Sequence, residues 1–340
     1  MASKDIARKP LELFAQGFQQ FRVLATAIDL GLFSKIPAMG STLPDMARVL
    51  GFEERPTRIL LGALVAMGLL TKRGSRYRNA PIAARYLVEG QPLFYGPFIQ
   101  MLDRRLYDAY RNLEIGLRTN RPLTADPAVG DLFQTMARDP AMTRLFTMGM
   151  HANGAYWAEQ LAKRIDVSRH RLLLDVGGGS GVYSIALARR CRGLRAMIFD
   201  LPGVLGVARE KIREAGLEAR ISTIAGDFLK DAWPRGADLV LFSAILHDWP
   251  PEVSTELLRK AAAVLPRGGE VIVRETFLDD DAAGPLYAAM SSVTLLVETH
   301  GENYAWATYE SWLREAGFGR FRRIPFPTTA GSGALLARKL

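Results

Sequence analysis

The stretch that decides the fold is "LLLDVGGGSGVYSIALARR", residues 172–190. A short apolar run leads into a glycine-dense turn, and apolar residues at helical spacing follow. This order predicts a buried strand, a tight loop and a helix. Gly177, Gly178, Gly179 and Gly181 carry no Cβ, so the backbone of the loop can approach a ligand closely. The stretch therefore predicts a ligand-binding loop.

The spacing of the glycines narrows the class of ligand. The dinucleotide fingerprint needs a Gly or Ala at its sixth position. Counted from Gly177 that position is Val182, and counted from Gly179 it is Ser184. The sequence also contains no G-x-x-x-x-G-K-[ST] phosphate loop. These departures favour a ligand without phosphates.

Acidic residues follow the strands around this loop. Asp175 precedes the glycines, Asp200 ends the run "IFDLP", and Asp227 ends the run "AGDF". A carboxylate after the second strand can accept hydrogen bonds from both hydroxyls of a ribose, and Phe228 is placed to lie beside an adenine. Three acids and an open loop suit an adenosine ligand that carries positive charge. S-adenosylmethionine fits this description.

Downstream of the loop, strand-like and helix-like runs of residues alternate. β-branched runs such as "RAMIFDL", "RISTIAGD", "ADLVLFSAI" and "EVIVRETF" are separated by helical stretches. This alternation predicts an α/β domain over residues 166–340, with a mostly parallel sheet covered by helices on both faces. Ligands in such sheets lie at the carboxyl ends of the strands.

The first 165 residues have a mostly helical pattern. Residues 41–81 predict two helices and a hairpin turning at Gly74-Ser75, which is the winged-helix pattern. The second helix contains "ILLGALVAMGLL", which is almost wholly apolar and is expected to be buried. A DNA-binding regulator would present polar side chains there, so a dimerisation domain is favoured. We expect a winged-helix-like dimerisation domain at 1–100 and helices lining an acceptor pocket at 101–165.

Composition restricts the partners and the compartment. The 340 residues carry a formal charge of +9, but the basic residues are spread along the chain with acids between them. This distribution indicates a basic surface without a nucleic-acid partner. No apolar run reaches the ~20 residues that span a bilayer, and the N-terminus has no signal-peptide pattern. A single cysteine, Cys191, excludes an internal disulfide and a Cys-based zinc site. We expect a cytoplasmic protein without a membrane partner.

Six motifs taken in order resemble one family. They are "LLLDVGGGSG", "FDLPGV", "GDF", "LHDWP", "LPRGGEVIVRE" and "WLREAGF". Together they resemble the small-molecule O-methyltransferases that include plant phenolic and bacterial polyketide enzymes. The resemblance covers nearly the whole chain and implies a Rossmann-like catalytic domain, an intertwined homodimer, a small-molecule acceptor and a place in secondary metabolism. The residues expected to bind S-adenosylmethionine are Asp175, Gly177, Gly179, Asp200, Leu201, Gly226, Asp227, Phe228 and Ser243.

The stretch "FSAILHDWPP", residues 242–251, places a histidine at the end of a predicted strand. A phenol has a pKa of about 10, so a base with a pKa near ~6.5 within hydrogen-bonding reach can take its proton. The resemblance implies that His247 is this base and that Glu275 is one of two acids flanking it. The second acid falls in "THGENYAW", where Asn303 stands at its position and Glu302 is one residue away. Asp248 is a further catalytic candidate.

The same histidine also permits a different chemistry. His247, Asp248 and His300 match the 2-His-1-carboxylate set that holds zinc or iron. A branch of the family that methylates the β-carbon of 2-oxo acids at a metal site resembles this arrangement. Neighbouring residues point apart on a strand, however, and converge only where the backbone turns. We expect O-methylation with His247 as base, with metal-dependent C-methylation as the alternative. His151 and His170 lack motif context and are expected to be structural or on the surface.

Overall fold

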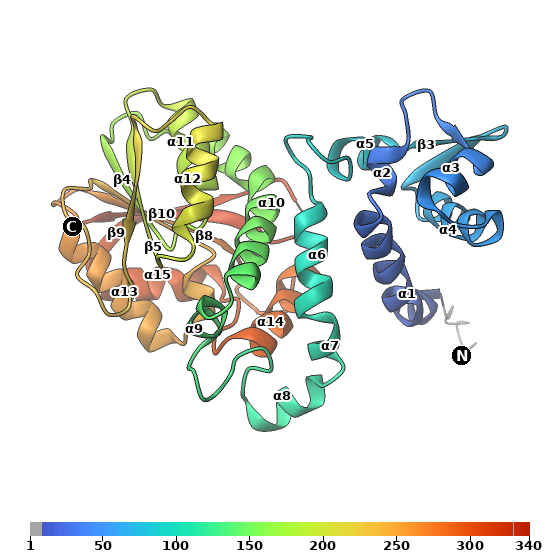
Figure 1. Ribbon diagram of the computed structural model, residues 1–340. Helices are drawn as coiled ribbons and strands as arrows, with labels where there is room; N and C mark the ends of the chain where they lie inside the picture. The colour runs from blue at the N-terminus through green and yellow to red at the C-terminus, as the bar shows by residue number, and fades with distance from the viewer. Residues whose placement is uncertain (1–8, 329) are drawn as a thin grey trace, which may run out of the picture. The chain divides into compact units, whose positions relative to one another are not determined.

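The computed structural model describes residues 9–328 and 330–340. The chain divides into two compact units, Met1–Arg104 and Arg105–Leu340 (Figure 1). Across the described ranges, no helix is both long enough and apolar enough to cross a membrane.

The first unit combines helices with a small sheet. It contains α1 (Lys9–Asp29), α2 (Leu32–Lys35), α3 (Leu43–Leu50), α4 (Glu54–Ala66), α5 (Pro81–Tyr86), β1 (Ser41–Thr42), β2 (Leu70–Arg73) and β3 (Arg76–Asn79). The strands pair antiparallel in the order β1-β3-β2. The predicted pair of helices followed by a hairpin is confirmed, and its turn contains Gly74 at φ 57°.

Local sequence sets the ends of α3. The Thr42 hydroxyl accepts a hydrogen bond from the backbone N–H of Asp45, and Pro44 occupies the first turn, where a missing N–H costs nothing. The helix ends at Gly51, whose φ of 72° is in the left-handed region that glycine tolerates.

The expectation that the second helix is buried is only partly met by α4. Leu61 and Leu64 are fully buried, but Ile59 is 52% exposed. A helix that is apolar all round buries only one stripe against a single layer, which leaves apolar side chains outside. The large apolar side chains exposed in this unit are Leu11, Leu13, Phe14, Phe18, Met39, Val49, Phe52, Ile59 and Ile82. So many exposed apolar residues are typical of a protein–protein interface.

In the second unit, helices precede the main sheet. They are α7 (Tyr107–Tyr110), α8 (Leu113–Thr119), α9 (Leu132–Ala137) and α10 (Pro140–Arg164), whereas α6 (Gly96–Arg105) belongs to the first unit except for its last residue. The carboxylate of Asp139 caps the long helix α10 by accepting hydrogen bonds from the N–H groups of Ala141 and Met142.

The sheet of the second unit is seven-stranded in the described part of the chain. Its strands are β4 (Leu172–Val176), β5 (Arg195–Asp200), β6 (Ile221–Ala225), β7 (Leu239–Ser243), β8 (Glu270–Thr276), β9 (Phe318–Pro325) and β10 (Ser332–Lys339). The order is β6-β5-β4-β7-β8-β10-β9. Strands β4 to β8 are parallel, as predicted, and β10 runs antiparallel to β8 and β9. The antiparallel strands β9 and β10 were not predicted from the sequence.

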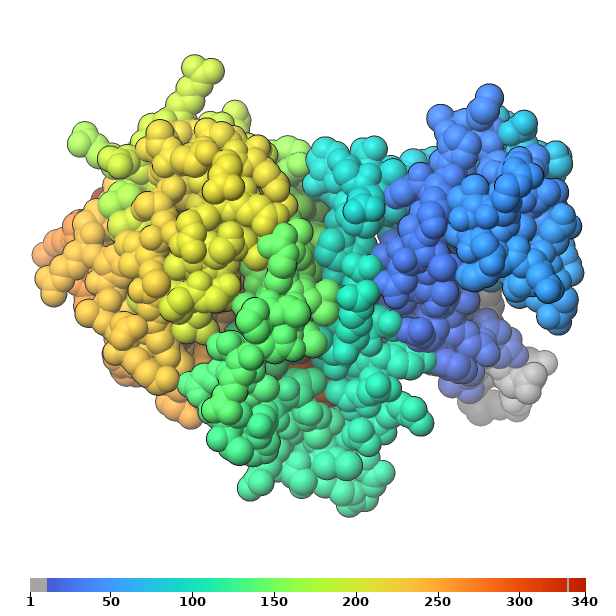
Figure 2. Space-filling view, in the orientation of Figure 1, coloured from blue at the N-terminus to red at the C-terminus, as the bar shows by residue number. Residues whose placement is uncertain are grey.

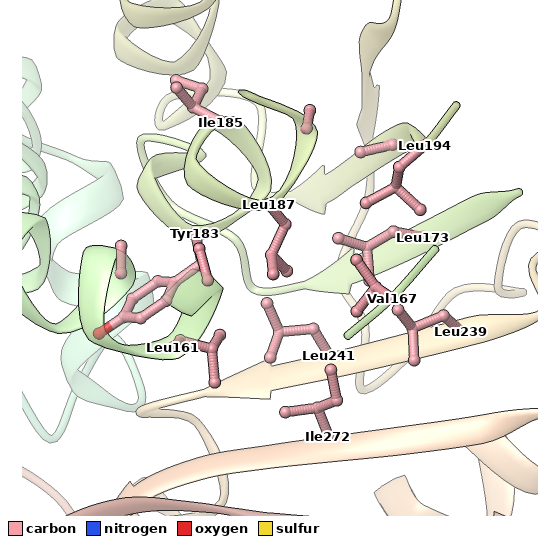
Figure 3. Close-up of a cluster of buried hydrophobic side chains, with 14 of the residues drawn as sticks. Leu161, Val167, Leu173, Tyr183, Ile185, Leu187, Leu194, Leu239, Leu241 and Ile272 are labelled. Carbon is pink, nitrogen blue, oxygen red and sulfur yellow. The ribbon is translucent and has the colours of Figure 1, made fainter. Parts of the chain in front are cut away.

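Helices cover both faces of this sheet, which gives the predicted Rossmann-like fold. Helices α10, α11 (Val182–Arg190) and α12 (Leu205–Glu214) lie on one face, and α13 (Pro251–Val264) and α15 (Trp306–Glu315) lie on the other (Figure 1). On the surface α10 lies beside α12 (Figure 2). Alternation along β4 sends Leu173 into the core under α11 (Figure 3) and Leu174 into the opposite core.

The strand order fixes where a ligand can bind. The chain runs outward from β4 through β5 to β6, then returns to the other side of β4 as β7. Crevices form outside the carboxyl ends of the strands at such a reversal. The glycine loop follows β4 and the histidine stretch follows β7, so both predicted functional segments meet at this edge.

Candidate active site

The glycine loop is shaped by contacts that exclude side chains. Gly177 and Gly181 have φ of 64° and 75°, and a Cβ on either would overlap the side chain of Ile245 or Ile198. Glycine is therefore required at both positions. A Cβ on Gly179 would meet no atom within 4 Å, so the loop is open at that point. The open side is where a ligand can approach the backbone.

Asp200 ties the loop to the end of β5. One carboxylate oxygen accepts a hydrogen bond from the Gly179 N–H at 2.7 Å, and the other accepts one from the Leu201 N–H at 2.7 Å. Burial raises the pKa of Asp200 to about 6, although both hydrogen bonds lower it. Each oxygen keeps a second lone pair, so the carboxylate can still accept hydroxyl groups from a ligand.

The residues after β6 differ in whether their side chains remain available to a ligand. The Gly226 N–H donates to the Asp200 carbonyl at 3.0 Å. The Asp227 carboxylate accepts from the Leu229 N–H at 2.9 Å and pairs with the Lys230 ammonium at 3.0 Å, so local partners already engage it. The Phe228 ring lies next to the loop, because a Cβ on Gly177 would come within 3.3 Å of it.

Two buried polar side chains beside the loop each have an oxygen without a hydrogen-bond partner among the described residues. Asp175 is 1% exposed, and one of its oxygens accepts from the Ser184 hydroxyl at 2.6 Å while the other has no hydrogen-bond partner. Burial raises the pKa of Asp175 to about 7. The Ser243 hydroxyl at the end of β7 is also buried and has no hydrogen-bond partner of normal geometry among the described residues, although the Tyr183 hydroxyl lies near it. Such groups are normally satisfied, so both fit the polar atoms of a bound ligand.

His247 lies on a short 3-10 helix, η1 (Leu246–Asp248), directly after β7. Its Nδ1 is 2.7 Å from Oε2 of Glu275, which is fully buried. The other oxygen of Glu275 accepts from the Ile245 and Leu246 N–H groups at 3.1 Å each. Glu275 therefore fixes both the imidazole and the backbone that carries it.

The turn of η1 brings adjacent side chains together. His247 Nε2 lies 3.7 Å from Oδ1 of Asp248, which a strand would not allow. Burial disfavours the imidazolium, but the charges of Glu275 and Asp248 outweigh it and raise the pKa of His247 to about 9. Burial also raises the pKa of Asp248 to about 7. The imidazole of the free protein is thus protonated at neutral pH, and it is a stronger base than an ordinary histidine.

A cavity of about 390 Å³ opens beside η1. Its lining residues are Arg121, Pro122, Ala125, Pro127, Gly130, Asp131, Leu132, Phe133, Asp248, Trp249, Glu298, Thr299 and His300. The size suits a small molecule. Asp248 at the end of η1 and Trp249 directly after it both line the cavity, so the histidine lies next to the space that an acceptor can fill.

The loop after α14 (Leu286–Glu298) packs on η1, because a Cβ on Gly301 would overlap the His247 carbonyl oxygen. The side-chain amide of Asn303 instead donates to the Ala288 carbonyl on α14 at 2.9 Å, and Glu302 is exposed. Neither supplies the expected second acid. Asp248 is the second carboxylate beside the histidine.

The predicted metal-binding set is not assembled. Within residues 9–328 and 330–340, no group of three or more His, Cys, Asp or Glu side chains is placed to hold a metal ion. His247 turns its Nδ1 to Glu275, and His300 is an exposed residue of the cavity wall. The metal-dependent alternative for His247, Asp248 and His300 is not supported.

One site residue had no signal in the sequence. His151 on α10 lies with Nδ1 2.9 Å from the Ser180 hydroxyl of the glycine loop. Burial lowers the pKa of His151 to about 4, so it is neutral and links α10 to the loop. By contrast, His170 lies 3.1 Å from Glu270 at the start of β8, away from the carboxyl edge, where it is structural.

Known proteins resemble this chain over almost its whole length. Residues 110–319 match an O-methyltransferase domain, and residues 13–89 match an O-methyltransferase dimerisation domain. The 3-hydroxy-5-methyl-1-naphthoate 3-O-methyltransferase of Streptomyces sahachiroi is 38% identical, over 96% of this chain and 93% of the relative. The L-tyrosine C(3)-methyltransferase of Streptomyces lavendulae is 34% identical, over 95% and 90%. The crystal structure of human N-acetylserotonin methyltransferase with S-adenosylmethionine superposes with a TM-score of 0.89 at 28% identity, covering 100% and 99% of the chains.

Proposed function

Because the chain belongs to the O-methyltransferase family and is an S-adenosylmethionine-dependent methyltransferase, we propose that it methylates a hydroxyl on a small aromatic acceptor with His247 as the base. The contact of 2.7 Å between His247 and the buried Glu275, beside the cavity, is the observation that carries this proposal. It is the arrangement of an oriented general base.

The residues around the glycine loop fit the methyl donor. We assign the ribose hydroxyls to Asp200, the adenine to the neighbourhood of Phe228, and the polar amino acid part to Asp175 and Ser243. The partner-free oxygens of Asp175 and Ser243 support the last assignment. When bound, the donor supplies an electrophilic methyl group that needs no further activation.

His247 prepares the acceptor by taking its proton. Glu275 engages Nδ1, which leaves Nε2 on the side of Asp248 and the cavity. With a pKa of about 9, the imidazole is close in basicity to a phenolate, whose conjugate acid has a pKa of about 10, so proton transfer in the complex is nearly balanced. Asp248 stabilises the imidazolium that forms.

The names of two relatives define an acceptor to test. One acts on a hydroxylated naphthoate, and the other methylates a carbon of L-tyrosine. We expect 3-hydroxy-1-naphthoate, incubated with the protein and the methyl donor, to gain a methyl on oxygen, as identified by NMR of the product. The methoxy compound, which has no free hydroxyl, is the control and should not react. A methyl group on a ring carbon would contradict the proposal.

We also propose that the first unit is a winged-helix-like domain that forms a homodimer in the cytoplasm. The dimerisation-domain match and the exposed apolar side chains of α1 support it. Sedimentation should give a dimer at micromolar concentration. The double substitution Phe14→Glu and Phe18→Glu should shift it to monomer, because two charges cannot be buried in an apolar interface. A wild-type protein that sediments as a monomer would contradict the assignment.

A further inference from the structure

A buried cation lies on the face of the sheet opposite to His247. Arg274 precedes Glu275 on β8, so its side chain points to the α10 and α11 side. The residue is 5% exposed, and its one hydrogen bond to the described residues is a long contact of 3.5 Å to the Ser332 hydroxyl. Its Nε has no hydrogen-bond partner among those residues. In the described part of the chain, no carboxylate forms an ion pair with it.

Aromatic rings surround this guanidinium. Its central carbon lies 5.8 Å from the Trp157 ring and 5.6 Å from the Tyr183 ring. Cation–π contacts offset part of the loss of hydration but leave the N–H donors of Arg274 without acceptors. A buried charge is normally paired, so the missing acceptor is expected to come from outside the chain.

The strand register places Arg274 in a row with two other polar groups. Ser243 pairs with Arg274 across β7 and β8, and Asp175 pairs with Leu241, two residues before Ser243. The side chains of Asp175, Ser243 and Arg274 therefore share one face. Each of the three has a buried polar atom without a partner.

This row adjoins the glycine loop. A Cβ on Gly178 would lie 2.7 Å from the Asp175 carboxyl carbon. Tyr183 covers the row from α11, and its hydroxyl oxygen points away from the other labelled side chains in Figure 3. Burial raises the pKa of Tyr183 while the charge of Arg274 lowers it, in keeping with their proximity.

We propose that Arg274 binds a carboxylate of a bound ligand, either the methionine carboxylate of the methyl donor or a carboxylate on the acceptor. The proposal rests on the donor site proposed above. A guanidinium matches the two oxygens of a carboxylate with parallel N–H donors. The Ser243 hydroxyl is a further donor, and Asp175 can accept from an ammonium group. A carboxylate, a hydroxyl and a guanidinium in one row suit a ligand group that carries both an ammonium and a carboxylate.

The test separates the two sources by removing the carboxylate from each ligand. Isothermal calorimetry on wild type and Arg274→Met would use S-adenosylhomocysteine and 5′-methylthioadenosine, which lacks the amino acid part. The acceptor pair is 3-hydroxy-1-naphthoate and the same ring system without its carboxylate. Arg274→Met should raise the Kd of one carboxylate ligand about 10- to 100-fold and leave its truncated counterpart unchanged. The pair that responds identifies the source.

Controls distinguish this role from a structural one. Arg338→Met removes a cation from the opposite end of the sheet, where it donates to the Gly268 carbonyl, and should change no Kd. Arg274→Lys should recover part of the lost affinity. If Arg274→Met fails to fold, the wild type alone can be used. Its Kd for S-adenosylhomocysteine is then compared with its Kd for the uncharged carboxyl amide of that ligand, and the Kd values of the two acceptor probes are compared in the same way. Equal effects on full and truncated ligands, or none, would overturn the inference. A wild type that does not bind S-adenosylhomocysteine would instead refute the donor site itself.

Discussion

A buried cationic side chain lies on each face of β8, and the groups that surround the two side chains differ. On one face His247 has two carboxylates close by, Glu275 at 2.7 Å and Asp248 at 3.7 Å. On the other face Arg274 has aromatic rings and a hydroxyl but no carboxylate among the described residues. The first site holds its proton by its own charges, whereas the second lacks an anion. Under the two proposals, the site that moves a proton has its charged partners within the chain, whereas the site that holds a ligand takes its anion from that ligand.

The largest effect is expected when His247, the proposed base, is removed. His247→Ala should lower the rate of methyl transfer to 3-hydroxy-1-naphthoate about 10²- to 10⁴-fold, the usual contribution of a general base. His300→Ala changes a histidine on the cavity wall that does not contact Glu275, and should have a much smaller effect. Steady-state assays of both variants would check this. Loss of less than about fivefold in His247→Ala would remove the base from the mechanism.

Asp200 tests whether a carboxylate that already holds the loop also binds the ribose. Asp200→Ala should weaken the binding of S-adenosylhomocysteine by about 1 to 3 kcal/mol, because polar partners lose their acceptor. Asp227→Ala should have a smaller effect, since its carboxylate is engaged by Leu229 and Lys230. Calorimetry on the two variants compares them directly. Unchanged affinity in Asp200→Ala would refute the assignment.

The carboxylates around His247 should affect how kcat/KM for the acceptor depends on pH. Because its pKa is about 9, kcat/KM for the acceptor should rise with pH and level off near that value. Glu275→Gln removes a negative neighbour, which lowers the pKa of the histidine, so the midpoint should move to lower pH by about one pH unit. A pH–rate profile of each protein measures this. A midpoint that does not move would show that Glu275 acts by position alone.

The smallest predicted effect is a change in thermal stability at Asp175, on the same face of the sheet as Arg274. Burial raises the pKa of Asp175 from its ordinary value to about 7, so ionisation of this group opposes folding. Its contribution is unfavourable above pH 7 and disappears as the pH falls toward its unfolded value, about 4. Asp175→Asn should raise the Tm of the ligand-free protein by about 2–4 °C at pH 8, and by less at pH 5, where the unfavourable contribution is partly lost. Thermal melts at both values would check it. An equal shift at both would contradict the ionisation argument.

Much of this site follows from sequence because local rules apply to it. The glycine loop, Asp200 and the strands up to β8 were predicted from runs of residues that specify their own structure. Strand β9 was missed because "FGRFRRIP" carries arginines and gives little apolar alternation. The structural role of Asn303, the link from His151 to the loop and the isolation of Arg274 depend on contacts between distant segments. The raised pKa of His247 depends on the carboxylates of Glu275 and Asp248, which only the folded chain brings beside the imidazole.

The contact of Gly301 with the His247 carbonyl has a consequence for engineering and for evolution. Thr299 and His300 form part of the cavity wall, so they are natural positions at which to change the choice of acceptor. One residue further on, any side chain would push on the backbone of His247. A library covering residues 299–301 should therefore yield new specificities only from members that keep glycine at 301, and the other members should lose turnover with every acceptor alike.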